Sequence, residues 1–294
     1  MPAERPYDLI IIGAGPAGVG AAVQGALYGA RTLVIEKGCV GGRLDLARRV
    51  DNFPWAGEEA ARDGRQLCRR FKKWLATAGV PVVTGAVERA SYSRGRFTLF
   101  CEGTTAYHAS SVIVATGVEP EPWRVRGVIG AGDRVCRDWR MIPRKRGEVA
   151  VIGGGETAFD QACGLAERGH KVSVLIRGER SRAYPGLVTE AIRLGVVIVT
   201  KAAITSVHRD GRKILLTAAD GRSFDCDHVL PAIGHRPRLP ALDRSARLKM
   251  GHGLWLAGDV REPVCRQAAI AFGDGVRCAM LAWAGREPDA RCMR

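Results

Sequence analysis

Several features that define common classes of site are missing from this chain of 294 residues. Its nine cysteines include no C-x-x-C pair, and its six histidines are scattered without zinc spacing, so we expect no metal site. No apolar run approaches the roughly 20 residues that cross a bilayer, so we expect no membrane span. The first predicted strand begins at about Tyr7, which leaves no room for a signal peptide. We therefore expect a cytoplasmic protein with free thiols.

Lysine is also scarce, although the chain is strongly basic. Only eight of the 45 basic residues are Lys, and the net charge is +15. Two local clusters stand out among the widely spread arginines, Arg69–Lys73 and Arg144–Arg146. Such a charge indicates either an ordinary solvated surface or a docking face for an acidic protein partner or an anionic substrate. No nucleic-acid recognition motif accompanies it, so we do not expect nucleic acid as a partner.

A dinucleotide-binding motif begins with the apolar run Leu9–Ile12, which is typical of a strand buried on both faces of a parallel sheet. In the G-x-G-x-x-G turn that follows, Gly13 permits a tight turn, Gly15 lets a pyrophosphate approach, and Gly18 lets helix and strand pack closely. An Ala-rich helix then directs free N–H groups at the phosphates. The next strand ends at Glu36, where a carboxylate binds an adenosine ribose.

The same pattern returns in the second half of the chain. Residues 148–155, EVAVIGGG, are again a strand and a glycine turn, and residues 228–234 close this unit as residues 111–117 close the first. Short strands of a β-meander precede each closing segment. The repeat predicts an α/β fold of two Rossmann-like, three-layer ββα nucleotide-binding domains, each with a β-meander insertion. We expect one domain from residues 1–117 and 239–294, with 118–238 inserted as the other.

The two repeats differ where the ribose would bind. Glu36 stands eighteen residues after Gly18, but the same step from Ala158 reaches Ile176, which Arg177 follows. Arginines here, with Arg182 nearby, suit a 2′-phosphate and therefore favour NADPH over NADH. The alternative is that they are surface arginines without a ligand.

The C-terminal part of the chain offers a second group of ligand-binding residues. A strand in residues 253–259, GLWLAGD, ends in Asp259, and an Ala-rich helix begins shortly after Gln267. A helix N-terminus aimed at the pyrimidine end of a flavin would stabilise the anionic reduced form.

These motifs together resemble the low-molecular-weight thioredoxin reductase family of FAD-containing pyridine-nucleotide oxidoreductases. The matching motifs are GAGPAG, GGRL…VDNFP, ATG, GGGETA, AIGHRP and LAGDV…RQA, in the family's order over nearly the whole chain. The resemblance implies FAD on the first domain, NADPH on the second, a homodimer, and a domain rotation that alternates access to the flavin. The FAD contacts that it implies are Gly13, Gly15, Pro16, Ala17, Gly18, Glu36, Lys37, Gly42, Arg43, Leu44, Asn52, Val87, Ala115, Thr116, Gly117, Gly258, Asp259, Arg266, Gln267 and Ala268. The NADPH contacts are Gly153, Gly154, Gly155, Glu156, Thr157, Arg177, Arg182 and Gly234.

The chain departs from the family at the redox-active dithiol. Members that reduce thioredoxin carry C-x-x-C followed by Asp; here the segment is CRDWR, so that Cys136 remains, Trp139 replaces the second cysteine, and Arg140 replaces the acid. Thiol–disulfide exchange needs a second thiol to resolve the mixed disulfide, and Trp cannot supply it. We therefore expect no thioredoxin reduction by the usual dithiol route.

Three hypotheses concern the residues that remain there. Cys136 is either a partly buried thiol without a role or a thiolate whose pKa Arg137 or Arg140 lowers. In the second hypothesis, Trp139 stacks on the flavin and shields it, and it therefore quenches flavin fluorescence. Substitute thiols are the third hypothesis, with Cys39, Cys265 and Cys292 as the alternatives.

Three functions follow from these alternatives. The first is an NADPH-dependent FAD reductase whose acceptor is an acidic electron carrier of ferredoxin or flavodoxin type, a quinone or a small oxidant. The second is a disulfide reductase or dithiol oxidase that uses an unconventional thiol. The third is a non-enzymatic flavin-binding sensor or scaffold.

Overall fold

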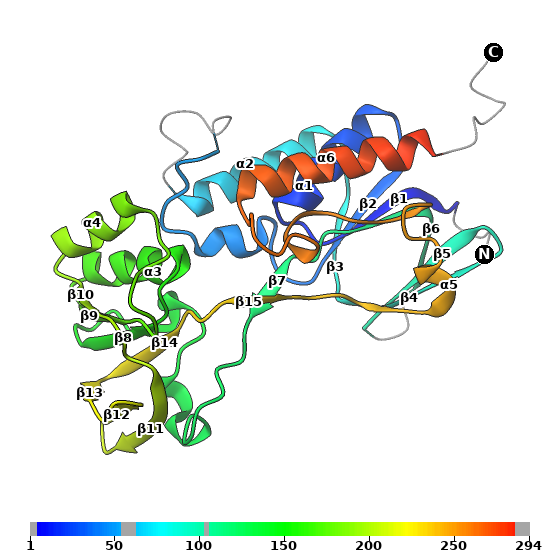
Figure 1. Ribbon diagram of the computed structural model, residues 1–294. Helices are drawn as coiled ribbons and strands as arrows, with labels where there is room; N and C mark the ends of the chain where they lie inside the picture. The colour runs from blue at the N-terminus through cyan, green and yellow to red at the C-terminus, as the bar shows by residue number, and fades with distance from the viewer. Residues whose placement is uncertain (1–4, 54–62, 103–105, 286–294) are drawn as a thin grey trace, which may run out of the picture. The chain divides into compact units, whose positions relative to one another are not determined.

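The chain divides into two compact units in the computed structural model, which describes residues 5–53, 63–102 and 106–285 (Figure 1). Unit 1 takes in the described residues of Met1–Leu46, Val50–Glu119 and Pro237–Arg294. Unit 2 comprises Pro120–Arg236 together with Ala47–Arg49. The chain thus enters unit 2 between residues 119 and 120 and leaves it between residues 236 and 237. The sequence predicted these boundaries at 117/118 and 238/239. The inclusion of Ala47–Arg49 in unit 2 was not predicted.

A five-stranded parallel sheet forms the centre of unit 1. Its order is β3 (Val82–Thr84), β2 (Thr32–Glu36), β1 (Tyr7–Ile12), β6 (Ala106–Val114) and β17 (Leu254–Leu256). Strand order reverses between β1 and β6, and ligands of such sheets bind outside the carboxyl ends of the strands at this switch point. The first glycine turn follows β1 directly, so the fold places it at this position.

A second branch joins the same sheet through β6. β5 (Arg96–Cys101) pairs antiparallel with β6 and with β4 (Val87–Ser93), and the short edge strand β16 (Ala241–Leu242) pairs parallel with β4. The period-two pattern predicts a short strand over 106–108, separate from the closing strand 111–117, but β6 is one continuous strand. Its first half pairs antiparallel with β5 and its second half parallel with β1. The polar residues at 110–111 lie where the pairing partner changes, which is why they looked like a break.

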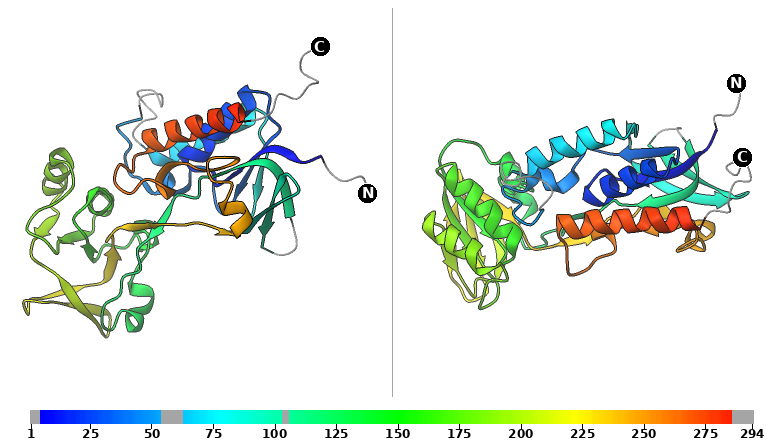
Figure 2. Two further views of the ribbon diagram at one scale, coloured as in Figure 1. Left: turned by 45° about the vertical axis from the view of Figure 1, so that its right-hand side comes forward. Right: turned by 90° about the horizontal axis from the view of Figure 1, so that it is seen from above.

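Helices cover one face of this sheet. α1 (Pro16–Leu27) lies between α2 (Gly64–Thr77) and α6 (Ala268–Ala284), as the view from above in Figure 2 shows. α2 begins at the N-cap Asp63, whose carboxylate accepts a hydrogen bond from the N–H of Arg65. The helical spacing of the apolar residues in this segment predicts an amphipathic helix over 58–78, and residues 58–62 of that range lie outside the described residues.

β1 is buried on both faces, as its uninterrupted apolar run predicted. Leu9 and Ile11 face α1, because a Cβ on Gly25 would lie 3.0 Å from Leu9 and a Cβ on Gly18 would lie 3.5 Å from Ile11. Ile10 and Ile12 belong instead to the cluster that includes the meander residue Phe97. All four strand residues are less than 5% exposed, which fixes the strand that carries the turn from both sides.

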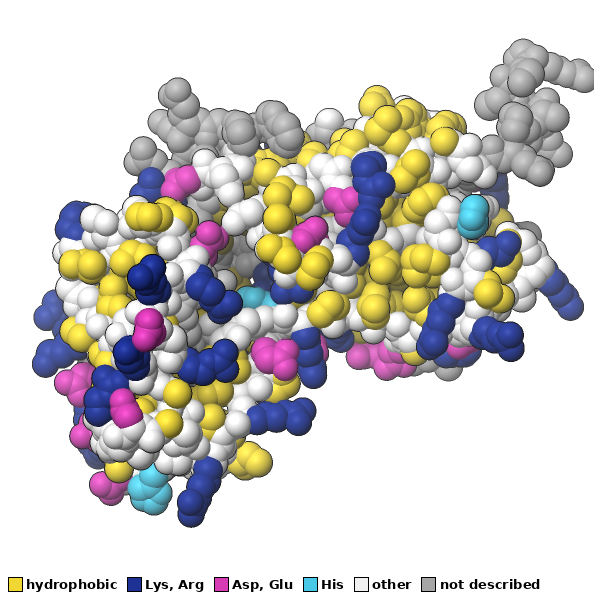
Figure 3. Space-filling view, viewed as in Figure 1, with side chains coloured by type: hydrophobic (Ala, Val, Ile, Leu, Met, Phe, Trp, Pro, Cys, Tyr) yellow, Lys and Arg dark blue, Asp and Glu magenta, His cyan; other side chains and the backbone are white. Residues whose placement is uncertain are grey.

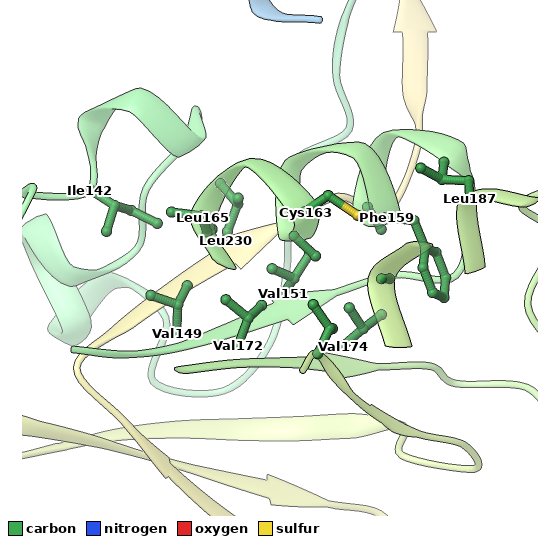
Figure 4. Close-up of a cluster of buried hydrophobic side chains, with 14 of the residues drawn as sticks. Ile142, Val149, Val151, Phe159, Cys163, Leu165, Val172, Val174, Leu187 and Leu230 are labelled. Atoms are coloured by element: carbon green, nitrogen blue, oxygen red, sulfur yellow. The ribbon is translucent and has the colours of Figure 1, made fainter. Parts of the chain in front are cut away.

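Unit 2 repeats the layered design. Its parallel sheet has the order β10 (Val197–Val199), β9 (Lys171–Leu175), β8 (Glu148–Ile152) and β14 (His228–Pro231). α3 (Glu156–Glu167) and α4 (Pro185–Arg193) pack on one face, and Figure 4 shows the core between the sheet and α3. The meander on the other face is a separate three-stranded sheet of β11 (Ile204–Asp210), β12 (Lys213–Ala218) and β13 (Ser223–Cys226).

The fold predicted from the repeat is therefore confirmed: each unit has a helical layer, a parallel sheet and a meander. Short elements complete the two units. They are the 3₁₀ turns η1 (Gly42–Leu46), η3 (Ile129–Arg134), η4 (Trp139–Met141) and η5 (Gly258–Val260), the short helix α5 (Arg244–Arg247), and the paired strands β7 (Val118–Pro120) and β15 (His235–Pro237). Within the described ranges, no helix combines the length and the apolar composition that a membrane crossing requires.

Arg48 accounts for the membership of residues 47–49 in unit 2. Its side chain is only 12% exposed and lies among three carboxylates, at 3.5 Å from Asp160, 2.8 Å from Glu167 and 3.1 Å from Glu190. The N–H of Arg48 also donates to Asp160 at 2.9 Å. Burial raises the pKa of Asp160 to about 6, although Arg48 opposes the shift.

This shift makes the stability of the protein depend on pH in a defined direction. Because the pKa of Asp160 is higher in the folded than in the unfolded chain, the native state binds more protons between about pH 4 and pH 6. Ionisation of Asp160 therefore lowers the free energy of unfolding as pH rises through this window. We expect the difference in the free energy of unfolding between Asp160→Asn and the wild type to shift by roughly 2–3 kcal/mol in favour of the variant as the pH rises from 4 to 7. Urea unfolding at each pH measures this difference. Glu167→Gln, at a carboxylate that is 44% exposed, is the control. A constant difference across this range would contradict the assignment.

Candidate functional site

The first glycine turn is closely packed at two positions and open at a third. Gly13 has a φ of +104°, and a Cβ there would lie 2.5 Å from the carbonyl oxygen of Ala115. A Cβ on Gly18 would lie 1.8 Å from the carbonyl oxygen of Gly13. At Gly15, by contrast, a Cβ would have no heavy atom within 4 Å. The backbone of Gly15 thus faces open space, which fits the approach of a pyrophosphate.

The helix after this turn has no side chain at its N-cap. The N-cap of α1 is Gly15, followed by Pro16 and Ala17, and α1 has no side-chain cap hydrogen bond. The N-cap of α6, Gln267, likewise makes no side-chain cap, so Ala268 opens a second uncapped helix. Uncapped helix N-termini carry unpaired N–H donors and a positive dipole end, which attract phosphate or an anionic ring.

Glu36 is held at the end of β2 by two backbone donors. One carboxylate oxygen accepts the N–H of Ala14 at 2.6 Å and the other accepts that of Gly38 at 2.7 Å. The side chain is buried beside the turn. Each carboxylate oxygen has a second lone pair, so the fixed group can still accept a ribose hydroxyl. This geometry fits the predicted role of Glu36.

The loop after Glu36 lies along the glycine turn. Gly41 donates its N–H to the carbonyl of Ala14 at 2.8 Å, and a Cβ on Gly42 would lie 3.6 Å from the Cα of Gly15. Leu44, in η1, is buried. The sequence predicted an extended segment along a ligand, and the structure places its middle part against the turn, with a 3₁₀ turn at residues 42–46.

Residues predicted at the flavin end come together from distant parts of the chain. The amide of Asn52 donates to the side-chain carbonyl of Gln267 at 2.9 Å across 215 residues. Asp259 is close enough to Arg266 and Arg43 for both to act on its carboxylate. Burial raises the pKa of Asp259, and the two guanidinium groups oppose that shift. The described residues here therefore supply the amide, carboxylate and cationic groups that bind a polar ring system.

The remaining predicted FAD contacts occupy the edge of the same unit. The hydroxyl of Thr116 donates to the carbonyl of Arg238, and the carbonyl of Gly117 accepts the N–H of Arg238 at 3.1 Å. Lys37 is near Arg238 as well: burial and that charge lower the pKa of Lys37, while Glu36 and Glu119 oppose the shift. Val87 begins β4, opposite Cys101.

Sequence reasoning missed one residue that supports this site. Asp274, in α6, accepts a hydrogen bond from the N–H of Gly258 at 2.8 Å and thereby holds the start of η5. Gly258 itself has a φ of +73°. No motif marks Asp274, because its role depends on where the helix passes the loop.

The second glycine turn has the same backbone construction. The N–H of Gly153 donates to Leu175 at 3.0 Å, as that of Gly13 donates to Ile35 at 2.8 Å. A Cβ on Gly153 would lie 2.2 Å from the carbonyl of Ala232, and a Cβ on Gly155 would again meet nothing within 4 Å. α3 then begins without a side-chain cap, and its first residues are Glu156 and Thr157. Nearby, the carbonyl of Gly234 accepts the N–H of Glu121.

The ribose position of unit 2 is apolar where that of unit 1 is acidic. Ile176 is buried, and a Cβ on Gly154 would lie 2.8 Å from its Cγ2. The loop beyond is tied to the turn, because the N–H of Arg182 donates to the carbonyl of Gly154 at 2.7 Å. Arg177 and Arg182 are exposed, and so is Arg180, which the sequence reasoning passed over. This arrangement fits a 2′-phosphate, and no carboxylate stands at the strand end, where unit 1 has Glu36.

Cys136 is an enclosed thiol. It is 2% exposed, its N–H donates to Val229, and its Sγ lies 3.8 Å from the carbonyl oxygen of Asp133. Burial raises the pKa of Cys136, and Asp133 and Asp138 raise it further against the opposing charge of Arg134. Arg140 pairs with Asp138 at 3.0 Å. This environment agrees with the buried-thiol alternative and contradicts a pKa lowered by Arg137 or Arg140.

Trp139 packs on the core of unit 2. A Cβ on Gly164 of α3 would lie 2.9 Å from its Cζ3, so only glycine leaves room for the ring. The guanidinium of Arg168 stacks over the ring at 4.0 Å from the centroid. Of the proposed substitute thiols, Cys39 and Cys265 are exposed, and Cys292 lies outside the described residues. No group of three or more described His, Cys, Asp or Glu residues has the geometry of a metal site.

The contrast between Gly15 and Gly18 gives a matched test of the FAD assignment. We expect Gly15→Ala to leave the unfolding free energy of the apoprotein within about 1 kcal/mol, because the new methyl enters open space. The same methyl would block the pyrophosphate, so FAD affinity should fall by at least about tenfold in a fluorescence titration. Gly18→Ala should instead cost roughly 1–3 kcal/mol of stability even without FAD. Unchanged affinity in Gly15→Ala would contradict the assignment.

Trp139→Ala separates packing from flavin shielding. Removing the ring leaves a cavity beside Gly164, so we expect a loss of roughly 2–4 kcal/mol in the free energy of unfolding, with a smaller loss in Trp139→Phe. If the Trp139 ring also shields the flavin, its removal should in addition raise the flavin emission yield of the alanine variant. An unchanged yield would rule out shielding, and an unchanged stability would contradict the packing described above.

Comparison with known proteins places this architecture among the flavin-dependent reductases. The model of the pyridine nucleotide-disulphide oxidoreductase family matches residues 7–275. The thioredoxin reductase of Treponema pallidum is 29% identical over 95% of this chain and 97% of its own length. Among solved structures, the thioredoxin reductase of T. acidophilum has a TM-score of 0.84 at 23% identity, covering 96% of this chain and 99% of that one. The bacillithiol disulfide reductase of Staphylococcus aureus has a TM-score of 0.76 at 20% identity, covering 96% and 100%.

The two structural likenesses confirm the fold alone, and the family match supplies the identity. The chain belongs to the pyridine nucleotide-disulphide oxidoreductase family and is a thioredoxin reductase-like flavoprotein oxidoreductase, of a group whose cofactors are FAD and NADPH.

Proposed function

We propose that this protein oxidises NADPH and passes the electrons through FAD to an acceptor outside its own chain. The observation that carries the proposal is the environment of CRDWR: Cys136 is buried with a raised pKa, and Trp139 fills the place of a second thiol. Thiol–disulfide exchange needs an accessible thiolate and a resolving thiol. The described residues of this segment supply neither of them.

We assign FAD to unit 1 and NADPH to unit 2. Glu36, fixed by two backbone N–H groups, supports a ribose with free hydroxyls, as FAD carries. Ile176 with the exposed Arg177 and Arg182 supports a phosphorylated ribose, as NADPH carries. The joined Asn52 and Gln267 support the flavin end of the first site.

The protein's own part in the reaction is binding, orientation and charge. When bound, FAD supplies the chemistry that takes a hydride from NADPH and gives up two electrons. The two glycine turns hold the pyrophosphates at uncapped helix ends. The N-terminus of α6 stabilises negative charge next to Gln267. Burial raises the pKa of Asp259, and the charges of Arg266 and Arg43 oppose that shift.

An acidic electron-carrier protein is the acceptor that the surface favours. The chain has a net charge of +15, and Figure 3 shows Lys and Arg side chains spread over the viewed face. Opposite charge accelerates the encounter of two proteins more than it strengthens the final complex. Electron carriers that must dock and leave many times benefit from that property.

Anaerobic mixing of the FAD-loaded protein with NADPH and with NADH tests the first half-reaction. We expect rapid bleaching of the flavin by NADPH and a slower reaction with NADH. Arg177→Ala/Arg182→Ala should raise the half-saturating NADPH concentration by at least about tenfold and leave that of NADH unchanged, because only NADPH has the 2′-phosphate. Failure of NADPH to bleach the flavin would overturn the proposal.

The reduced protein is then mixed with a panel of acceptors that includes thioredoxin. We expect no turnover of thioredoxin, and Cys136→Ser should reduce the other acceptors at the wild-type rate. Disulfide turnover that disappears in Cys136→Ser would instead establish a disulfide reductase.

A further inference from the structure

We propose that one face of α2 is the docking surface for the acidic carrier, and this inference rests on the proposed function. The face is a basic stripe of four residues, Arg65, Arg69, Lys72 and Lys73. Their spacing places them within one third of the helix circumference. All four are exposed, whereas Leu67, Phe71 and Leu75 on the opposite side are buried.

Among the residues that the structure describes, the stripe has almost no neutralising charge. After the N-cap Asp63, α2 contains no acidic residue from Gly64 to Thr77. Arg65 approaches Asp45 at 4.0 Å, the outer limit of an ion pair, and Arg69, Lys72 and Lys73 have no carboxylate partner among the described residues. The stripe is therefore open to charges from another molecule.

The arrangement is unfavourable for the helix by itself. Arg69 stands four residues after Arg65 and three or four residues before Lys72 and Lys73, and like charges at these spacings destabilise a helix. Arg65 also lies in the first turn, where the positive end of the helix dipole disfavours a cation. A surface shaped only for stability and solubility would alternate acidic and basic residues. Binding of an anionic partner would remove this repulsion.

The buried side of α2 connects the stripe to the candidate flavin site. Phe71 packs against Phe53 and Phe272 with ring centroids 5.8 and 6.1 Å apart, and Trp74 packs against Phe272 at 6.0 Å. Phe53 follows Asn52 directly, and Phe272 lies in α6 shortly after Gln267. A carrier on the stripe would be separated from these segments by about one helix diameter, roughly 10 Å.

The reaction that this docking serves balances with a one-electron carrier. Oxidation of one NADPH to NADP⁺ releases two electrons and one proton, and two oxidised carriers each accept one electron. Carrier molecules must therefore dock twice in each turnover. A surface that steers encounter by charge, without a large apolar contact, permits this rapid exchange.

Binding without turnover provides the test. The probe is oxidised plant-type [2Fe–2S] ferredoxin, added to the full-length FAD-loaded protein without NADPH at an ionic strength of about 0.1 M, where charges act over about 10 Å. We expect Arg69→Gln/Lys72→Gln/Lys73→Gln to raise the dissociation constant by about tenfold and to weaken its salt dependence. Glutamine keeps the helix propensity, so folding is preserved. The charge-conserving variant Arg69→Lys/Lys72→Arg/Lys73→Arg should bind ferredoxin as the wild type does.

The matched control removes three charges elsewhere. Arg144, Lys145 and Arg146 are exposed in unit 2, and their triple glutamine variant has the same net charge as the stripe variant. We expect less than about a twofold change in this control. Equal effects of the two variants, or no binding of ferredoxin by the wild type, would overturn the docking assignment. Anaerobic flavin reduction by NADPH is measured separately, so failure of the proposed function is distinguishable from failure of docking.

Discussion

The close approach of α1 to the ends of β1 and β6 is the constraint on which the first site depends. The carbonyl of Ala115 occupies the space of a Gly13 side chain, and the carbonyl of Gly13 occupies that of Gly18. These contacts leave the N-terminus of α1 uncapped beside Gly15. Because the packing is tight at Gly13 and Gly18 and open at Gly15, the helix end and the open space belong to one feature. A ligand phosphate completes it.

In the proposed function, the same backbone would serve a different ligand in each unit because one strand-end residue differs. Unit 2 repeats the turn with Gly153 against Ala232, and it tolerates Ala158 at the third motif position. What differs is Ile176 in place of Glu36. A carboxylate beside the turn accepts hydroxyls and repels a phosphate, whereas a methyl group does neither and leaves recognition to the arginines beyond it. Specificity is thus decided at the edge of a site whose frame is shared.

In the proposed function, the electron exit differs from that of a dithiol enzyme because of packing as well as sequence. Trp139 does more than remove a thiol: its ring lies on Gly164 and beneath Arg168, inside the helical layer of unit 2. Cys136 is enclosed in the same cluster. Under the proposed function, an acceptor outside the chain therefore receives the electrons. α2 packs on segments next to Asn52 and Gln267 and carries an unbalanced positive charge. We therefore propose this helix as the docking surface for the acceptor.

The sequence by itself determined the layered fold, the two glycine turns and the contrast between Glu36 and Ile176. These features follow from local patterns: buried apolar runs, glycines that backbone contacts demand, and a fixed step from turn to strand end. The sequence pattern wrongly predicted a break in β6, because a strand that changes partners shows the same polar interruption as a turn.

Only the tertiary structure decided which distant residues meet. Asn52 and Gln267 are joined across 215 residues, Asp274 supports Gly258, and Arg48 lies among carboxylates of α3 and α4. The burial of Cys136 was likewise decided there, and with it the direction of its pKa shift. Burial and pairing arise from what the rest of the chain packs against a residue. A local pattern in the sequence carries no record of that packing.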